Sequence, residues 1–341
     1  MKKTNRLCRL TGPSTHVMLC RSERAMRAYN ISLEQHREPT MAEADEITQL
    51  ITLRDWLRFA VSRFNAAGLV YGHGTATALD EAAFLILHTL HLPVDQLEPW
   101  MGCRLLTSER QALQQIIEKR IATRKPAPYL TNQAWIQGQP FYVDERVIVP
   151  RSYIGELLAG DLEGIAPDPA SVRSVLDLCT GSGCLAILAA LRFEEAKVDA
   201  SEISADALAV AGINVREYRL EDRIELIRSD LFAGLGSRRY DLILSNPPYV
   251  DAEAVSSFPP EYAAEPKLAH AGGADGLDLV RRILAEAHNH LTPNGTLVVE
   301  IGRGRDRLQS AFPNLPFLWL DTAESAGEVF ALTRSDLDER G

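Results

Sequence analysis

The segment Asn246-Pro247-Pro248-Tyr249 follows the apolar run Leu242-Ile243-Leu244 and combines residue types that can hold a flat amino group. Each proline fixes its own φ and keeps the preceding residue extended, so the backbone is stiff before any ligand arrives. The Asn246 side-chain oxygen and the Pro247 carbonyl can then accept the two N–H bonds of one NH2 group, while the Tyr249 ring covers its flat face. Asn-Pro and Pro-Pro also occur in plain turns, so the upstream sequence must decide between a ligand site and a turn.

Strands and helices alternate from residue 174 onward, a pattern that predicts a parallel sheet with helices on both faces. Strand one (residues 174–177) leads through Cys179-Thr180-Gly181-Ser182-Gly183 into a helix. Gly181 and Gly183 permit positive φ and close approach of a ligand, and the helix N-terminus behind them offers free N–H groups.

The next two predicted strands end in acids. Glu202 lies nineteen residues after Gly183, a spacing at which an acid reaches a ribose diol. Asp230 ends strand three and can accept a hydrogen bond from an adenine amino group. Because the carboxyl ends of parallel strands share one edge of a sheet, we expect Asp177, Glu202, Asp230 and Asn246 around one pocket.

A dinucleotide site is the first alternative. However, Gly181-Ser182-Gly183 lacks the third glycine of GxGxxG, because Ala186 holds that position, and a GxG alone is a weak signal. A set of caps and turns is the second alternative. The conjunction of the acids, the glycine pair and Asn246 to Tyr249 at successive strand ends favours a ligand site over both.

The composition of the chain narrows the class of protein. No apolar run approaches the ~20 residues of a membrane span, and the five cysteines form no CxxC pair, which argues against a zinc site or a disulfide framework and favours a reducing cytoplasm. The formal charge of -10 disfavours a protein that follows nucleic-acid phosphates and suits a basic protein partner.

The chain divides into four segments that differ in charge and in hydrophobic pattern. Residues 1–40 carry eight Lys or Arg against three Glu, and we expect a disordered extension that precedes a true start at Met41; a transit peptide is the alternative. Residues 41–125 show helical periodicity, and Ser108 with Gln111 has the spacing of a capping box. Residues 126–170 contain short β-like runs, including residues 147–149, and predict a hairpin connector and linker. Residues 171–341 form the sheet domain, whose runs 317–320 and 329–332 predict a final hairpin.

These motifs resemble the class I S-adenosylmethionine-dependent methyltransferases and, within them, the protein-(glutamine-N(5)) methyltransferase family, from about Met41 to the C-terminus. The resemblance implies an α/β fold, Rossmann-like, with a seven-stranded mostly parallel sheet and a small N-terminal helical domain for substrate recognition. It implies S-adenosyl-L-methionine as the cofactor. Its binding residues would be Asp177, Cys179, Thr180, Gly181, Ser182, Gly183, Glu202, Asp230, Leu231 and Asn246.

The resemblance also implies the substrate side of the site. Asn246, Pro247 and Tyr249 would be catalytic, and Asn246, Pro247, Pro248, Tyr249, Arg151 and Glu265 would bind the glutamine substrate. Glu202 departs from the family, which more often has Asp there, and its longer side chain should still reach the ribose. The segment Gly272-Gly273-Ala274-Asp275-Gly276-Leu277 is a further match. The long stretch of residues 250–274, which we name the cover loop, is typical of a substrate cover.

Two branches of the family share this core. One resembles methyltransferases of peptide-chain release factors, in which Pro-Glu-Thr usually follows Pro150-Arg151, whereas this chain has Ser152-Tyr153-Ile154. Residues 64–75 resemble the branch that methylates large-subunit ribosomal protein three, and we take that branch as closer. A DNA adenine methyltransferase is the rival of a different substrate class, but it would need a basic face, and the chain beyond Met41 is acidic. A cofactor-binding module without activity would have no use for both acceptors and the aromatic ring.

The predicted chemistry is methyl transfer to a glutamine side-chain nitrogen. An amide nitrogen is a poor nucleophile because its lone pair is delocalised into the carbonyl. Two acceptors that bind both N–H bonds would align the nitrogen with the methyl donor and weaken that delocalisation. No general base is needed before attack, so we expect His270, His288 and His290 to be structural.

Overall fold

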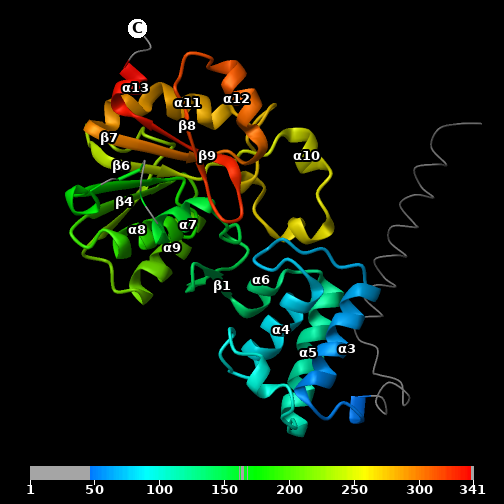
Figure 1. The fold of residues 1–341 in the computed structure, drawn as a ribbon. Helices are drawn as coiled ribbons and strands as arrows, with labels where there is room; N and C mark the ends of the chain where they lie inside the picture. The colour runs from blue at the N-terminus through cyan, green and yellow to red at the C-terminus, as the bar shows by residue number, and fades with distance from the viewer. Residues whose placement is uncertain (1–46, 161, 163–164, 167, 339–341) are drawn as a thin grey trace, which may run out of the picture.

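The computed structural model describes residues 47–338 except 161, 163–164 and 167. The prediction of a disordered extension concerns residues 1–40, which lie outside this range. The described chain forms a helical part and a sheet part, joined by a short hairpin (Figure 1).

The sheet part is built on seven strands. The strands are β3 (Ser174–Leu178), β4 (Lys197–Glu202), β5 (Ile224–Arg228), β6 (Tyr240–Ser245), β7 (Leu291–Glu300), β8 (Leu318–Asp321) and β9 (Ala326–Thr333). Their order in the sheet is β5-β4-β3-β6-β7-β9-β8. The first five are parallel, and β9 lies antiparallel between β7 and β8. The predicted mostly parallel sheet with a final hairpin is therefore confirmed.

Helices cover both faces of this sheet, and successive residues of a strand point to opposite faces, so each strand contributes side chains to two cores. Val175, Leu242 and Leu244 belong to the core that is shared with α7 (Tyr153–Ala159) and α8 (Cys184–Arg192). Leu176 and Ile243, one position along, belong to the core on the other face, under α11 (Asp278–Glu286). Further helices on these faces are α9 (Ala205–Glu217), α12 (Arg305–Ala311) and α13 (Arg334–Asp338) (Figure 1).

The helical part contains α3 (Leu53–Ala66), α4 (Ala78–Thr89) and α5 (Thr107–Thr123) around one apolar core. Thr52 caps α3 in a capping box with Asp55, and Thr77 caps α4. The predicted Ser108–Gln111 capping box is wrong. The N-cap of α5 is Leu106, two residues before Ser108, and the Glu109 carboxylate accepts from the Leu106 N–H at 2.7 Å, because Glu109 lies three residues after the N-cap.

The connector begins with α6 (Ala127–Thr131) and continues as the antiparallel hairpin of β1 (Gln133–Ile136) and β2 (Gln139–Tyr142). Residues 147–149, predicted as a third β-like run, are not a strand. Their backbone takes part in another interaction, since the Val149 N–H donates to the Glu265 carboxylate at 3.1 Å. The helix α7 falls inside the predicted connector and packs on α8 of the sheet part. The four-segment division otherwise stays a prediction.

No helix among the described residues is both long and apolar enough to span a membrane. The cover loop contains α10 (Ala252–Ser256) and two short 3-10 turns, Pro260–Ala264 and Lys267–Ala269. It lies beside the helical part in Figure 1, and the two are in contact: the Val70 N–H donates to Glu261, and the rings of His73 and Tyr262 are 4.3 Å apart.

Candidate functional site

The loops after β3, β4, β5 and β6 surround two adjoining cavities of about 280 and 310 Å³ at the carboxyl edge of the sheet. The cavities share Cys179, Gly181 and Asn246 in their walls. The smaller cavity is also lined by Arg151, Thr180, Ser182, Pro247, Pro248 and Tyr249, and the larger by Glu202, Asp230, Leu231, Pro248 and Arg282. Most of the predicted site residues therefore meet at this edge.

The glycine loop after β3 turns sharply into α8. Cys179, Gly181 and Gly183 all have positive φ, at 66°, 56° and 83°. A Cβ at Gly183 would lie 3.2 Å from the Ala211 Cβ of α9, so this glycine allows close packing of two helices. A Cβ at Gly181 would meet nothing within 4 Å, so Gly181 faces open space in the cavity. The loop thus presents backbone to a ligand at Gly181.

Asp177 is bonded to this loop and does not line either cavity. Its carboxylate accepts from the Thr180 hydroxyl and from the Ala186 N–H at 2.9 Å, which joins the loop to the first turn of α8. These contacts favour a role in shaping the loop over direct contact with a cofactor. Burial raises the pKa of Asp177 to about 7.

Glu202 and Asp230 enclose the larger cavity. One Glu202 oxygen accepts from the Gly181 N–H at 3.1 Å and the other from the Ser204 N–H at 3.0 Å, so the side chain is held at the mouth of the glycine loop. Asp230 forms an ion pair with Arg282 at 2.9 Å. The sequence offered no signal for Arg282, because it reaches the site from α11, across the sheet edge. The apolar residues Leu231 and Leu279 line the same cavity.

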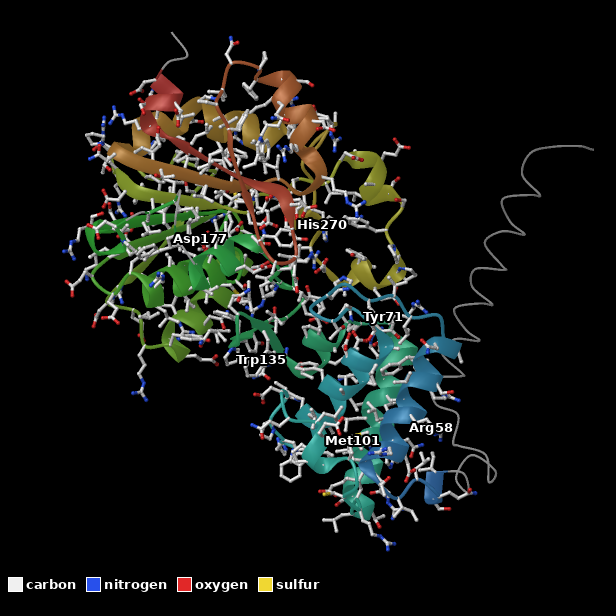
Figure 2. The ribbon with its side chains drawn as sticks, viewed as in Figure 1. Arg58, Tyr71, Met101, Trp135, Asp177 and His270 are labelled. Atoms are coloured by element: carbon white, nitrogen blue, oxygen red, sulfur yellow. The ribbon has the colours of Figure 1, made fainter. Side chains whose placement is uncertain are left out.

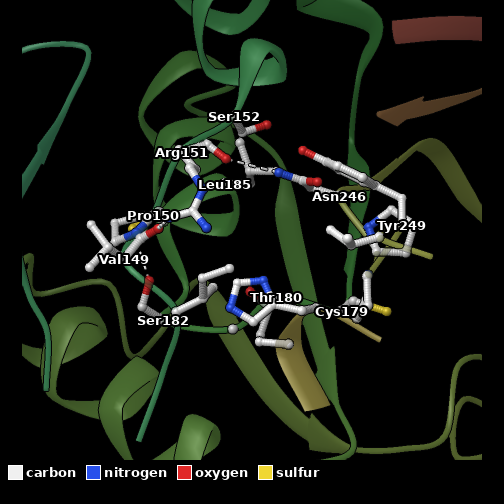
Figure 3. A pocket seen from close by; sticks show the side chains of 18 of the residues that line it. Val149, Pro150, Arg151, Ser152, Cys179, Thr180, Ser182, Leu185, Asn246 and Tyr249 are labelled. Carbon is white, nitrogen blue, oxygen red and sulfur yellow. Dashed lines mark hydrogen bonds between the residues drawn. The ribbon is translucent and has the colours of Figure 1, made fainter. Parts of the chain in front are cut away.

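Asn246 stands at the end of β6 with its amide oriented by the protein. Its nitrogen donates to the Arg151 carbonyl at 3.0 Å, shown as a dashed line in Figure 3. Because a carbonyl oxygen can only accept, the amide nitrogen must face Arg151, and the Asn246 oxygen is left for another donor. No hydrogen bond to that oxygen or to the Pro247 carbonyl forms within the part of the chain that the structure describes.

Tyr249 is tied to the end of β7. Its hydroxyl donates to the Glu300 carboxylate at 3.3 Å, and the other Glu300 oxygen accepts from the Ser152 hydroxyl at 2.6 Å and the Tyr153 N–H at 2.9 Å. Burial raises the pKa of Glu300 to about 7, and it also raises the pKa of Tyr249. Glu300 was not predicted as a site residue, although it ends an apolar strand and so carries the same signal as Glu202.

The glycine-rich segment of residues 272–277, which begins at the end of the cover loop, packs against the backbone of Tyr249. A Cβ at Gly272 would lie 2.7 Å from the Tyr249 Cα, and a Cβ at Gly276 would overlap the Tyr249 carbonyl oxygen. The two chain segments are also joined by hydrogen bonds from Val250 to His270 at 3.0 Å and from Gly272 to Val250 at 2.9 Å. The glycines therefore allow a second layer of backbone to support Asn246 to Tyr249 from behind.

Arg151 and Glu265 form a bidentate ion pair at 3.0 and 3.1 Å. The Glu265 side chain is fully buried, lines neither cavity, and also lies 2.9 Å from His270 Nε2 and 3.6 Å from His73 Nε2. Burial alone would raise the pKa of Glu265, but the two histidines and Arg151 hold it well below its usual range. Figure 2 places His270 where the sheet part approaches Tyr71 of the helical part.

The raised pKa values of Asp177 and Glu300 predict a pH-dependent stability. Each acid binds its proton more tightly in the folded protein than in the unfolded chain, where the values are 3.8 and 4.5. Their contribution to the free energy of unfolding is therefore full below those unfolded values and is lost as the pH rises through about 7. We expect this loss to lower the melting temperature between about pH 4.5 and about pH 7, and to lower it less in Asp177→Asn. Equal falls in both proteins, measured by circular dichroism, would contradict the assignment for Asp177.

The fold and the arrangement of these residues are those of a methyltransferase, and a family model described as "Methyltransferase small domain" matches residues 157–258. A ribosomal protein uL3 glutamine methyltransferase of Bradyrhizobium diazoefficiens is 56% identical over 296 residues, which cover 85% of this chain and 93% of the relative. Proteins of the same name from Neisseria gonorrhoeae and Bordetella pertussis are 56% and 54% identical over 85% of this chain, and 96% and 97% of each relative is covered. The chain belongs to the family of ribosomal protein uL3 glutamine methyltransferases.

Among solved structures, the hMettl16 catalytic domain in complex with a MAT2A 3'UTR hairpin is similar over 68% of this chain and 84% of that chain. The sequence identity is 15% and the TM-score is 0.44.

Proposed function

We propose that this protein transfers a methyl group from S-adenosyl-L-methionine to the side-chain amide nitrogen of a glutamine in ribosomal protein uL3. The observation that carries the proposal is the orientation of Asn246, which lines both cavities. Its nitrogen is bound to the Arg151 carbonyl, and its oxygen accepts no hydrogen bond from the residues that the structure describes. The relatives, named for the same activity, support the choice of uL3 over release factors or DNA. A ribosomal substrate also supports a cytoplasmic location.

The larger cavity fits the cofactor. Gly181 leaves open space in which a ligand can approach the protein backbone. Glu202 offers carboxylate oxygens for a ribose diol, and Leu231 and Leu279 offer apolar walls for an adenine. We infer that Cys179 and Asp230 complete this site, with Arg282 as the partner of Asp230. Thr180 and Ser182, which line the adjoining smaller cavity, and Gly183 behind them would hold the cofactor where the two cavities meet. When bound, S-adenosyl-L-methionine supplies a methyl group on a positively charged sulfur.

The substrate glutamine fits the smaller cavity. The Asn246 oxygen and the Pro247 carbonyl would accept the two N–H bonds of its amide, which fixes the direction of the nitrogen lone pair and weakens its delocalisation. Tyr249 would hold the amide plane from one side, with its ring kept in place by the bond from its hydroxyl to Glu300. No residue has to remove a proton before transfer, because the amide becomes acidic only as the new bond forms.

We propose that the helical part helps to receive the substrate protein. Its residues Gly72 and Thr75 line a third cavity, of about 430 Å³, together with Arg151 and Tyr249 of the proposed glutamine site. Glu156, Glu300 and Glu324 also line this cavity. The acidic lining suits a basic protein better than a nucleic acid, whose phosphates it would repel.

Glu202→Ala is expected to weaken cofactor binding, because the two ribose hydroxyls lose charge-assisted hydrogen bonds of about 1.5 to 3 kcal/mol each. Isothermal titration with S-adenosyl-L-methionine measures the effect. Glu225→Ala is a matched control, since Glu225 is an exposed acid of β5 that pairs with Arg238 and lines neither cavity. Unchanged affinity in Glu202→Ala would exclude the ribose assignment.

The proposed substrate is tested in a lysate of cells that lack this enzyme. The purified protein is added with S-adenosyl-L-methionine that carries a labelled methyl group, and the labelled macromolecule is identified. Label in uL3 is the expected result. Label in a release factor or in DNA, with none in uL3, would overturn the substrate and favour the corresponding alternative.

A further inference from the structure

We propose that Glu265 is a positioning residue, which sets the Asn246 side chain for methyl transfer by holding the backbone of Arg151. The inference rests on the proposed function and changes the part that the sequence assigned to Glu265, from contact with the substrate to control of the residue that binds it. Three observations carry it: the contacts of Glu265, its place behind the cavity wall, and the single hydrogen bond that orients Asn246.

The Glu265 carboxylate holds the segment of residues 149–151 at two points. One oxygen accepts from the Val149 N–H at 3.1 Å and from the Arg151 guanidinium at 3.0 Å, and the other accepts from the same guanidinium at 3.1 Å. Two parallel hydrogen bonds between a guanidinium and a carboxylate fix the relative orientation of the two side chains as well as their separation. The carbonyl of Arg151 directly follows the Cα that carries the anchored guanidinium, so holding this segment restricts where the carbonyl can lie.

That carbonyl is the acceptor for Asn246. The Asn246 nitrogen donates to it at 3.0 Å, and this contact decides which way the amide oxygen faces. If the segment moves, the amide can rotate, and the two proposed acceptors for the substrate no longer converge. Glu265 therefore acts on the substrate amide through Arg151 and Asn246, without touching the substrate.

Glu265 is itself held from both parts of the protein. His270 of the cover loop approaches one of its oxygens at 2.9 Å, and His73 of the helical part approaches the same oxygen at 3.6 Å. Tyr262 packs between these groups, 4.3 Å from the His73 ring and 5.9 Å from the Arg151 guanidinium. The carboxylate thus joins the cover loop, the helical part and the segment that orients Asn246.

The cover loop contains a matched control. Glu261, four residues before Glu265, is equally buried and pairs with Arg124 at 2.6 Å and the Val70 N–H at 3.1 Å. Neither partner touches Asn246 or the segment of residues 149–151. Glu261→Gln therefore removes a buried charge that joins the same loop to the helical part, and it leaves the orientation of Asn246 intact.

The test compares Glu265→Gln and Glu261→Gln in the full-length protein, each alone and combined with Asn246→Ala. We expect Glu265→Gln to lower kcat for uL3 methylation roughly 10- to 100-fold, the effect of a slightly misplaced reactant, with the affinity for S-adenosyl-L-methionine changed less than about twofold. Added to Asn246→Ala, it should lower kcat little further, because residues that act through one another are not additive. The effect of Glu261→Gln should be small and should be the same in both backgrounds.

The outcomes separate this inference from the proposed function. Failure of the wild-type protein to methylate uL3 would refute the proposed function. Wild-type activity with an unchanged kcat in Glu265→Gln, or with equal losses whether or not Asn246 is present, would refute the positioning role alone. If Glu265→Gln does not fold, Arg151→Lys takes its place, because it keeps a cation beside Glu265 and removes the bidentate hydrogen bonds. It should show the same non-additivity with Asn246→Ala, and additive losses would overturn the inference.

Discussion

Replacing Asn246 with alanine is expected to lower the single-turnover rate of uL3 methylation by at least two orders of magnitude. The substitution removes the acceptor that Arg151 orients, so the substrate amide is bound by the Pro247 carbonyl alone and rotates out of line. Misplaced reactants typically cost roughly hundredfold in rate. Quenched-flow methylation with the enzyme in excess isolates the chemical step from product release.

Two further measurements serve as controls for the effect of Asn246→Ala. The affinity for S-adenosyl-L-methionine should change much less than the rate, because Glu202 and the glycine loop remain. Asn246→Asp should also be slow, since a carboxylate oxygen would replace the nitrogen that donates to the Arg151 carbonyl, and two acceptors would face each other. Near wild-type rates for Asn246→Ala would refute the mechanism with two acceptors.

Replacing Gly276 with alanine is expected to lower kcat by roughly a hundredfold as well, from outside the cavities. The added Cβ would overlap the carbonyl oxygen of Tyr249, and the neighbour is backbone, which cannot rotate away. The strand end that carries Asn246 and Tyr249 must therefore shift. Steady-state kinetics with uL3 measures the loss, and cofactor titration shows that the cofactor cavity is intact.

Gly236→Ala is the matched control for this substitution. Gly236 also has a positive φ, 59° against 82° at Gly276, but a Cβ there would meet nothing within 4 Å. Both variants carry the strain of a left-handed backbone, and only Gly276→Ala carries the overlap. If the two variants lose the same activity at the same melting temperature, support of Tyr249 by the glycine-rich segment is not the cause.

The sequence predicted the sheet well because its strands are short apolar runs whose ends carry glycine or acids. Buried parallel strands need little more than β-branched and aliphatic residues, and the loops after β3 and β6 carry residues with restricted or unusual backbone geometry. For the same reason the sequence pointed to Gly181, Glu202, Asp230 and Asn246, because each lies at the end of a strand or just after it, and the strands end at one edge.

The contacts that orient these residues could not be predicted from local patterns. Arg282, Glu300 and Glu265 reach the site from segments far away in the chain, and their partners are decided by packing. The run of residues 147–149 was misread for a related reason. Its composition suits a strand, but the Val149 N–H is bound by a side chain from the cover loop, so no strand ladder forms there.

In the proposed reaction the methyl group reaches a side-chain nitrogen of glutamine. The most direct measurement is fragmentation mass spectrometry of uL3 after incubation with the purified enzyme and isotopically labelled S-adenosyl-L-methionine. The mechanism derived from Asn246, Pro247 and Tyr249 predicts one labelled methyl group on the amide nitrogen of a glutamine. A label on lysine, arginine or a backbone nitrogen of uL3 would contradict it.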